Sequence, residues 1–162
     1  MGRPKALVDG WLRAAVRALH DGGCEEVVVV LGAEAEKAAE LVPGERVVVA
    51  TDWSTGMGAS LRVGLAALEP TSHEAALIHL VDLPDVKAAV VARLRGYAGP
   101  DSLARAVFSG EPGHPVLFGR HHWVGAAASA TGDHGARDYL RAHQVRLVEC
   151  GDLATGRDRD TR

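Results

Sequence analysis

A run of β-branched residues limits the folds open to this chain of 162 residues. Residues 26–31 read EVVVVL, and the run is apolar at alternate positions of both phases. A strand with two apolar faces is expected inside a parallel sheet that helices cover on both sides. Residues 47–50 form a similar, shorter run. A third run at 75–81 (AALIHLV) is followed at once by Asp82 and Pro84.

Segments with the periodicity of helices separate these runs. In the first, 11–20, one face carries the apolar residues Leu12, Ala15, Val16 and Leu19. Two glycines, Gly22 and Gly23, follow and favour a helix end there. Further helices are predicted at 33–41, 58–68, 86–97 and 136–143. This alternation predicts an α/β fold: a three-layer, mostly parallel Rossmann-like sheet with right-handed crossovers and helices on both faces.

The second half of the sequence is less regular. Short strands are predicted at 105–108 and 116–118, around a turn, and a last strand at 146–149. From residue 151 onward the chain is polar and charged, which on composition alone favours a loosely ordered tail. With no internal repeat and no linker, residues 1–162 are expected to form a single domain.

Composition excludes several classes of function. The formal net charge of −3 argues against a general nucleic-acid binder, which needs a basic face. No apolar run reaches the roughly 18 residues of a membrane span. The two cysteines, Cys24 and Cys150, lie far apart and form no CxxC pair. A reducing, cytoplasmic location is therefore expected.

Ligands of an open α/β sheet bind beyond the carboxyl ends of its strands, so residues after each run are candidates. Asp82 is the first, because a carboxylate at a strand end can hold Mg²⁺ together with phosphate oxygens and water. It could equally be a turn or helix-capping residue before Pro84. A second candidate is the segment 51–61, TDWSTGMGASL, where Gly56 and Gly58 permit close backbone approach to a nucleotide. The same segment would also serve as an ordinary helix start.

Other candidates are weaker when taken singly. Arg3 and Lys5 could neutralise the β- and γ-phosphates of a nucleotide, although basic residues near a terminus are usually only solvated. His114 lies in a Gly-His-Pro turn and could meet an acidic substrate or take part in a proton transfer. Asp133 could contact substrate or simply cap a helix. Asp160, in the charged tail, has no role on composition alone.

Taken in order, six segments resemble one family, the molybdenum-cofactor nucleotidyltransferases of the MobA-like group. The segments are MGRPKAL (1–7), WSTGMGASLRVGL (53–65), VDLP (81–84), GHPVLFG (113–119), GDHGARDYL (132–140) and GDLATGRDRDT (151–161). They cover nearly the whole chain at plausible spacing. Each is weak alone, and the ordered set is specific.

The resemblance implies roles for individual residues. Lys5 matches the motif lysine that contacts the nucleotide phosphates, and Arg3 lies in the loop beside it. The loop that holds the base and ribose corresponds to Gly56, Met57, Gly58 and Ser60. Asp82 matches the strand-end metal ligand, and Asp160 matches the acidic position that completes the Mg²⁺ site. That match implies a tail folded back over the sheet.

His114 and Asp133 fall in segments similar to the cofactor-facing side, which implies contact with molybdopterin. The proline at position 4, the Gly-His-Pro turn and the stretch 132–137 resemble the cytidylyl branch more than the guanylyl branch. The implied reaction joins CMP from CTP to the terminal phosphate of molybdopterin and releases pyrophosphate. The guanylyl reaction with GTP, or transfer to a sugar phosphate on the same fold, stays an alternative. A partner in molybdoenzyme maturation is also implied.

The sequence departs from the family at its first residues. The family begins with a strand and a glycine-rich LAAGxxxRMGxxK segment, and only the tail of that segment, from Met1 to Lys5, is present. The absent strand would lie in the centre of the sheet, and its neighbours would lack backbone partners. Such a chain is expected to be inactive and poorly stable. Either translation starts upstream of Met1, which is the preferred explanation, or the chain is a remnant that binds without catalysis.

Overall fold

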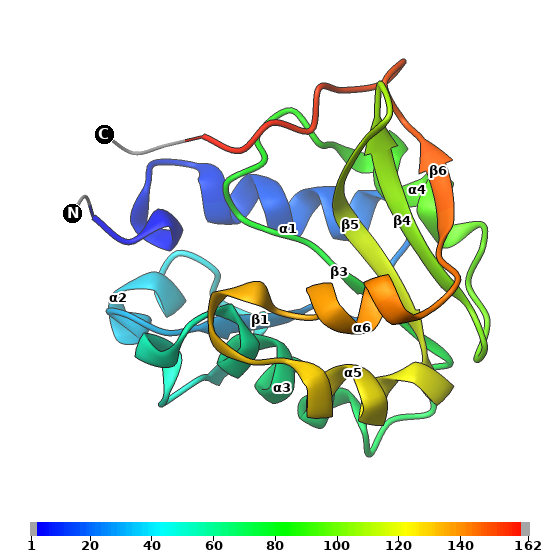
Figure 1. Ribbon diagram of the computed structural model, residues 1–162. Helices are drawn as coiled ribbons and strands as arrows, with labels where there is room; N and C mark the ends of the chain where they lie inside the picture. The colour runs from blue at the N-terminus through cyan, green and yellow to red at the C-terminus, as the bar shows by residue number, and fades with distance from the viewer. Residues whose placement is uncertain (1–2, 160–162) are drawn as a thin grey trace.

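A computed structural model describes residues 3–159 of the chain (Figure 1). Its helices are α1 (Trp11–Asp21), α2 (Ala35–Ala39), α3 (Met57–Leu68), α4 (Ala88–Arg95), α5 (Trp123–Ser129) and α6 (Arg137–Ala142). Its strands are β1 (Val28–Leu31), β2 (Arg46–Val49), β3 (Ala75–Ile78), β4 (Leu103–Phe108), β5 (Glu111–Gly119) and β6 (Arg146–Glu149). Four short 3-10 turns, η1 (Lys5–Leu7), η2 (Trp53–Thr55), η3 (Arg120–His122) and η4 (Gly132–His134), connect them. The α/β class expected from the sequence is confirmed.

The strands form two sheets. In the first, β1 and β2 pair in parallel, with Val28 opposite Arg46. The second has the order β3-β5-β4-β6, in which β5 runs antiparallel to both neighbours and β4 pairs with β6 in parallel. Within residues 3–159, β1 and β3 therefore each pair along one edge only. This interruption lies where the sequence predicted that a central strand would be missing.

Helices cover both faces of the four-stranded sheet. On one face, α3, α5 and α6 enclose a cluster that includes Leu65, Phe118 and Trp123. On the other face, α4 supplies Val90 and Leu94, which pack against β4, β5 and β6. A third cluster joins α1 and α2 to β1, and the half-buried Val81 packs against it. Three layers therefore form, as the alternation of strands and helices predicted.

Two elements differ from the sequence prediction. The strand predicted at 75–81 ends at Ile78, whose partner on β5 is Val116. The next residue of β5 in this register is Pro115, which has no N–H for the ladder, so the pairing stops. Helix α5, with the sequence WVGAAAS, was not predicted, because seven residues of mainly small side chains carry little periodicity.

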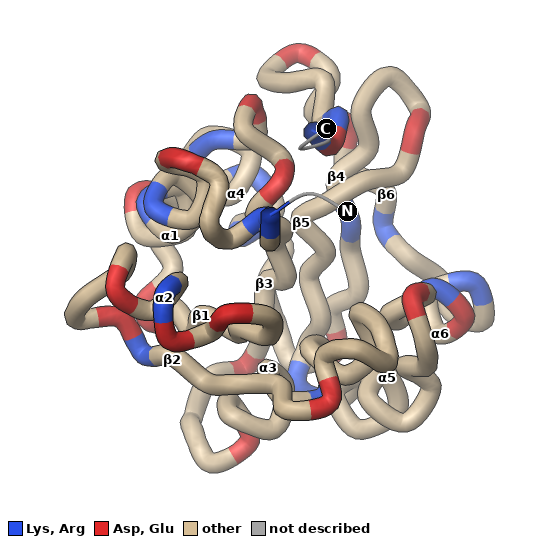
Figure 2. The backbone as a smooth tube through the Cα atoms, turned by 90° about the vertical axis from the view of Figure 1, so that its left-hand side faces the viewer, with Lys and Arg blue, Asp and Glu red and all other residues tan. Residues whose placement is uncertain are grey.

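The C-terminal segment is the clearest correction. Composition alone favoured a loose tail after residue 151, yet this segment packs across the molecule. Arg93 forms a two-pronged ion pair with Asp152, at 2.7 and 3.0 Å. Farther along, the N–H of Arg159 donates to the carbonyl of Asp82 at 2.8 Å. The tail folds back, as the family resemblance implied, and the described ends of the chain lie on one side of the molecule (Figures 1 and 2).

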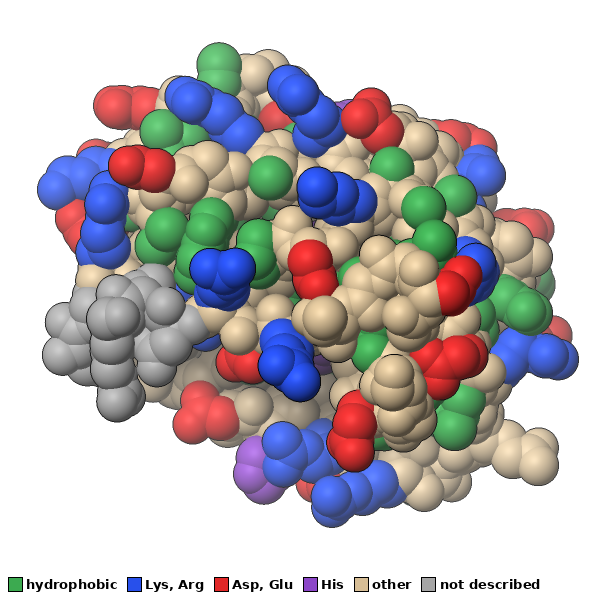
Figure 3. Space-filling view, turned by 90° about the horizontal axis from the view of Figure 1, so that it is seen from above, with side chains coloured by type: hydrophobic (Ala, Val, Ile, Leu, Met, Phe, Trp, Pro, Cys, Tyr) green, Lys and Arg blue, Asp and Glu red, His purple; other side chains and the backbone are tan. Residues whose placement is uncertain are grey.

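Surface charges are of mixed sign. On the face seen in Figure 3, basic and acidic side chains alternate with small apolar patches, and neither sign forms a continuous field. Among the helices of residues 3–159, none has the length and apolar character that crossing a membrane requires.

Trp123 offers a test of the core between β5 and α5. Its side chain is 1% exposed, and its Nε1–H donates to the carbonyl of Phe118 at 2.9 Å. Trp123→Ala leaves a large cavity and a carbonyl without its donor, so we expect a loss of about 3–5 kcal/mol in the free energy of unfolding. Trp53→Ala is the matched control, because Trp53 is 47% exposed. Urea unfolding measures both, and equal losses would contradict this description of the core.

Candidate active site

An ion pair joins the two residues that the sequence placed first. Lys5, in η1, directs its Nζ to the carboxylate of Asp82, which lies in the turn after β3. The Asp82 side chain is 9% exposed and the Lys5 side chain 46%. A buried carboxylate is stable only when a cation or hydrogen-bond donors compensate it. Lys5 provides that compensation from a position 77 residues away in the sequence.

The C-terminal segment closes one side of this pair. Besides the bond from Arg159 to the carbonyl of Asp82, Thr155 donates its N–H and its hydroxyl to the Asp85 carboxylate, at 2.7 and 2.6 Å. Burial raises the pKa of Asp85, but the hydrogen bonds from Thr155 and Gly156 outweigh it and lower the pKa overall. Asp160, expected to complete a metal site, lies outside the described residues.

Arg3 stands apart from the pair formed by Lys5 and Asp82. Its side chain is largely exposed, and its nearest opposite charge is Asp9, at 3.9 Å. The structure therefore gives Arg3 no contact with Asp82, and its phosphate-binding role stays a prediction.

Two buried histidines adjoin Asp82. His79 follows β3 directly, and His114 lies on β5, the strand that pairs with β3. Both ring nitrogens of His79 are buried and have no hydrogen-bond partner within residues 3–159. Arg105, on β4, donates Nε–H and Nη2–H to the carbonyl of Gly113, the residue before His114.

Burial governs the charge of these imidazoles. It lowers the pKa of His79 to about 4, against a smaller opposing effect from Asp82. The pKa of His114 is also lowered to about 4, by burial first and then by the charges of Arg105 and His79. Both side chains are therefore neutral near pH 7, and each can donate one hydrogen bond and accept another. His114, predicted to face the substrate, thus joins Asp82 in one polar cluster.

A second group of predicted residues lies after β1 and β2. Gly56 has φ +117°, and a Cβ atom there would come within 2.4 Å of the carbonyl carbon and oxygen of Gly132. Gly58 similarly approaches the backbone of Ala130 and Thr131. The loop at 56–60, which includes Met57 and Ser60, is therefore packed against the segment that carries Asp133. The sequence assigned these two loops to nucleotide and acceptor separately, and the structure brings them together.

Arg62 and Trp53 fix the shape of these loops. Arg62, on α3, donates to the carbonyl of Ala130, and its second nitrogen lies 3.4 Å from the Asp52 carboxylate. The Trp53 side chain packs on Gly32, where a Cβ atom would lie 2.6 Å from the Trp53 Cβ. The outer part of the indole and Met57 both stay substantially exposed.

The donor set suits a hard divalent cation held mainly by its ligand. Within residues 3–159 no three His, Cys, Asp or Glu side chains lie close enough to form a metal site. Asp82 provides one carboxylate beside a lysine. Mg²⁺ and similar ions accept one or two protein carboxylates when phosphate oxygens and water supply the other ligands. The described residues therefore fit a cation that arrives with a nucleotide triphosphate.

The comparison with protein families agrees with this arrangement. The sequence profile of the MobA-like NTP transferase domain matches residues 1–147. The chain belongs to this family. It is accordingly a nucleotidyltransferase, and its structural neighbours share the Rossmann-like fold.

Three relatives are informative. A protein named nicotine blue oxidoreductase, from Paenarthrobacter nicotinovorans, is 38% identical over 178 residues, which cover 99% of this chain and 86% of that protein. Rv0371c from Mycobacterium tuberculosis H37Rv, solved in complex with manganese, is 27% identical with a TM-score of 0.75. That match covers 92% of this chain and 83% of Rv0371c.

The third is a homologue of Rv0371c from Mycobacterium sp. strain JC1. It is 25% identical with a TM-score of 0.80, and the match covers 99% of this chain and 84% of that one. The likeness therefore extends over almost the whole chain in all three cases.

Sequence reasoning missed three residues of this region. His79 was hidden in the run AALIHLV, where a lone polar residue inside a predicted strand was the available signal. Arg105 interrupts a short strand in the same way. Trp53 lies in a segment chosen for its glycines, and its exposure has no sequence signature.

The two buried histidines predict a specific dependence of stability on pH. In the unfolded chain their pKa is about 6.5, whereas in the folded protein it is about 4. As the pH falls from 6.5 toward 4, the unfolded state takes up protons that the folded state does not. Stability should therefore fall in this window, by on the order of 3 kcal/mol for each imidazole.

We expect His79→Gln with His114→Gln to flatten this decline, measured by urea unfolding between pH 4 and 7.5. His134→Gln, at an exposed site, is the control and should leave the slope unchanged. A double variant with the slope of the unsubstituted protein would show that these imidazoles are not buried in neutral form.

Gly56 predicts the effect of separating the two loops. Gly56→Ala places a methyl group in the space held by Gly132 and imposes a backbone conformation that only glycine adopts readily. We expect a loss of at least about 2 kcal/mol in stability together with weaker nucleotide binding. Gly44→Ala is the control, because Gly44 also has positive φ (+87°) but nothing lies within 4 Å of a Cβ there. Calorimetric binding of a nucleotide should change only for Gly56→Ala.

Proposed function

We propose that this domain transfers CMP from CTP to molybdopterin and releases pyrophosphate. The observation that carries the proposal is the Lys5–Asp82 ion pair at the end of β3, with the neutral His114 beside it. A cation, a buried carboxylate and nearby hydrogen-bonding groups suit a triphosphate and a second anionic substrate.

The proposed step is an in-line displacement. An oxygen of the terminal phosphate of molybdopterin forms a bond to the α-phosphorus of CTP, and the bond from that phosphorus to the bridging oxygen of the β-phosphate breaks. Pyrophosphate leaves with the electron pair, so no covalent link to the protein is needed. The protein's contribution is orientation and charge neutralisation.

Lys5 would neutralise phosphate oxygens of the bound nucleotide. Its ion pair with Asp82 keeps the ammonium group in place before the nucleotide arrives. Asp82, with Asp160 as the second proposed ligand, would hold a divalent cation, which we propose is Mg²⁺. Bound there, such a cation supplies charge neutralisation at the phosphates. The manganese complex of Rv0371c supports the use of a divalent ion in this fold.

The two packed loops would hold the rest of the substrates. Gly56, Met57, Gly58 and Ser60 are proposed to contact the base and ribose, and Asp133 to contact the acceptor. Because Gly56 touches the backbone of Gly132, the two substrates would meet at this junction. Choice of CTP over GTP rests on the proline at position 4 and the Gly-His-Pro turn, both similar to the cytidylyl branch.

A second candidate follows from the relative named nicotine blue oxidoreductase, which is 38% identical. In this alternative the same face would bind a planar dye and a nicotinamide dinucleotide that exchanges electrons with it. The exposed indole of Trp53 suits a planar ligand.

One set of assays separates these functions. The chain, and the longer protein if the coding DNA continues upstream in frame, is incubated with Mg²⁺ or Mn²⁺, molybdopterin, and either CTP or GTP. Pyrophosphate release with CTP is expected. Release with GTP alone would reverse the choice of nucleotide. No release from the longer protein, with bleaching of nicotine blue by NADH or NADPH, would favour the redox alternative.

Release from a sugar phosphate in place of molybdopterin would identify a different acceptor. Nucleotide binding without release, in both lengths of protein, would indicate a binding module.

Asp82→Asn tests the proposed metal ligand. The substitution keeps the shape of the side chain but removes its charge, so Lys5 loses its partner and a cation loses a carboxylate ligand. We expect the rate of pyrophosphate release in the active form of the protein to fall at least about 100-fold. Asp85→Asn is the control, because that carboxylate binds Thr155 instead. An unchanged rate for Asp82→Asn would exclude its role in catalysis.

A further inference from the structure

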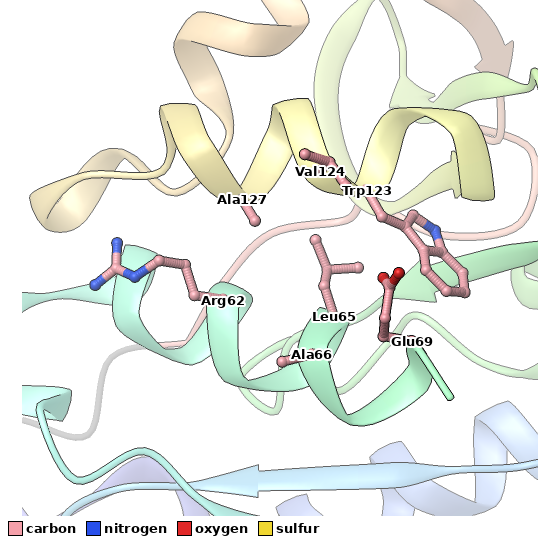
Figure 4. A pocket seen from close by; sticks show the side chains of 7 residues that line it. All are labelled: Arg62, Leu65, Ala66, Glu69, Trp123, Val124 and Ala127. Carbon is pink, nitrogen blue, oxygen red and sulfur yellow. The ribbon is translucent and has the colours of Figure 1, made fainter. Parts of the chain in front are cut away.

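An apolar groove of about 340 Å³ lies between α3 and α5, separate from the polar cluster around Asp82 (Figure 4). Leu65, Ala66, Trp123, Val124 and Ala127 line it. Charged side chains occur only at its two ends, where Arg62 and Glu69 complete the lining (Figure 4).

The composition of α5 is unusual for a surface helix. Its sequence, WVGAAAS, contains no charged residue, although Val124 is 74% exposed. Depletion of charge around exposed apolar side chains is typical of the centre of a protein interface. The small side chains of Ala66 and Ala127 would let another helix approach closely.

Charge decides which partner fits. Arg62 and Glu69 lie seven residues apart on α3, about 10 Å along the helix axis. A two-fold axis in the plane of the interface, crossing α3 near Leu65 and Ala66, would bring a second α3 against the first in the opposite direction. Arg62 would then face the partner subunit's Glu69, and Glu69 would face the partner subunit's Arg62. The groove is therefore complementary to a copy of itself, as an isologous dimer requires.

The internal contacts of Arg62 are compatible with this pairing. Its guanidinium donates to the carbonyl of Ala130 and reaches the Asp52 carboxylate at 3.4 Å. A guanidinium has five N–H groups, so donors are left for a second carboxylate. These internal bonds also hold the side chain in one position, which reduces the entropy lost on association.

We propose that the groove between α3 and α5 is the interface of a two-fold symmetric homodimer, in which Arg62 pairs with Glu69 of the partner subunit. Ala66, Val124 and Ala127 would lie at the centre of that interface, and the two symmetry-related ion pairs would lie at its rim.

Charge reversal tests the proposal by sedimentation velocity, at protein concentrations from about 1 to 100 µM. The unsubstituted protein should dimerise in this range. Arg62→Glu and Glu69→Arg, each alone, would place like charges together twice per dimer, and we expect association at least tenfold weaker for each. Glu40→Arg, at an exposed position on the far end of α2, should associate normally.

Mixing the two variants separates interface effects from folding defects. A heterodimer of Arg62→Glu with Glu69→Arg pairs opposite charges at both rims, so the mixture should recover association close to that of the unsubstituted protein. Glu69→Arg also keeps the internal bonds of Arg62, and near-ultraviolet circular dichroism verifies its fold.

Three outcomes would overturn the proposal. They are an unsubstituted protein that stays monomeric at 100 µM, single variants that associate as well as it does, and a mixture of folded variants that does not associate.

Discussion

Side-chain packing, and not a continuous hydrogen-bonded sheet, joins the two halves of this protein. Within residues 3–159 no backbone ladder connects β1 to β3. Helix α1 instead packs against α4, and α3 packs on β1 and β2 while also touching α5. Contacts between helices thus have to replace the directional bonds that a central strand would supply. The positions of Lys5 and Asp82, which come from opposite sides of this interruption, depend on that packing.

The polar cluster around Asp82 follows from the same arrangement. Burial keeps His79 and His114 neutral, and it makes the carboxylate of Asp82 dependent on Lys5. A nucleotide entering this cluster would meet one cation, one carboxylate and two neutral imidazoles, in surroundings where water screens charge poorly. The apolar groove between α3 and α5 has the opposite character, with charges restricted to its ends, so the two surfaces suit different kinds of partner.

Much of the fold could be predicted from local patterns. The runs at 26–31 and 75–81 and the periodicity of 11–20 each specify an element, because an apolar strand or an amphipathic helix has few alternatives. Helix α5 could not be predicted, since its position depends on Trp123 filling a space that β5 and α3 create. Strand β3 ends earlier than its sequence suggests because its partner strand has a proline at the next position, which only the register reveals.

The candidate site divides in the same way. Lys5, Asp82 and the glycines at 56 and 58 could be named because their types and spacing match a motif. His79 could not, because its significance comes from burial beside Asp82 and from nitrogens without partners. The order of the tail was predicted through family resemblance and not through composition. Its anchors, Arg93 to Asp152 and Thr155 to Asp85, are long-range pairs that composition does not reveal.

The return of the tail to Asp82 has a practical consequence for anyone who handles this protein. Arg159 bonds to the backbone of Asp82, and Lys5 bonds to its side chain, so both ends of the described chain border the site. An affinity tag or fluorescent fusion at either end would start beside the proposed entrance for substrates. The exposed turn at Gly44, where nothing lies within 4 Å of an added Cβ, is a safer place for an epitope or a surface tether.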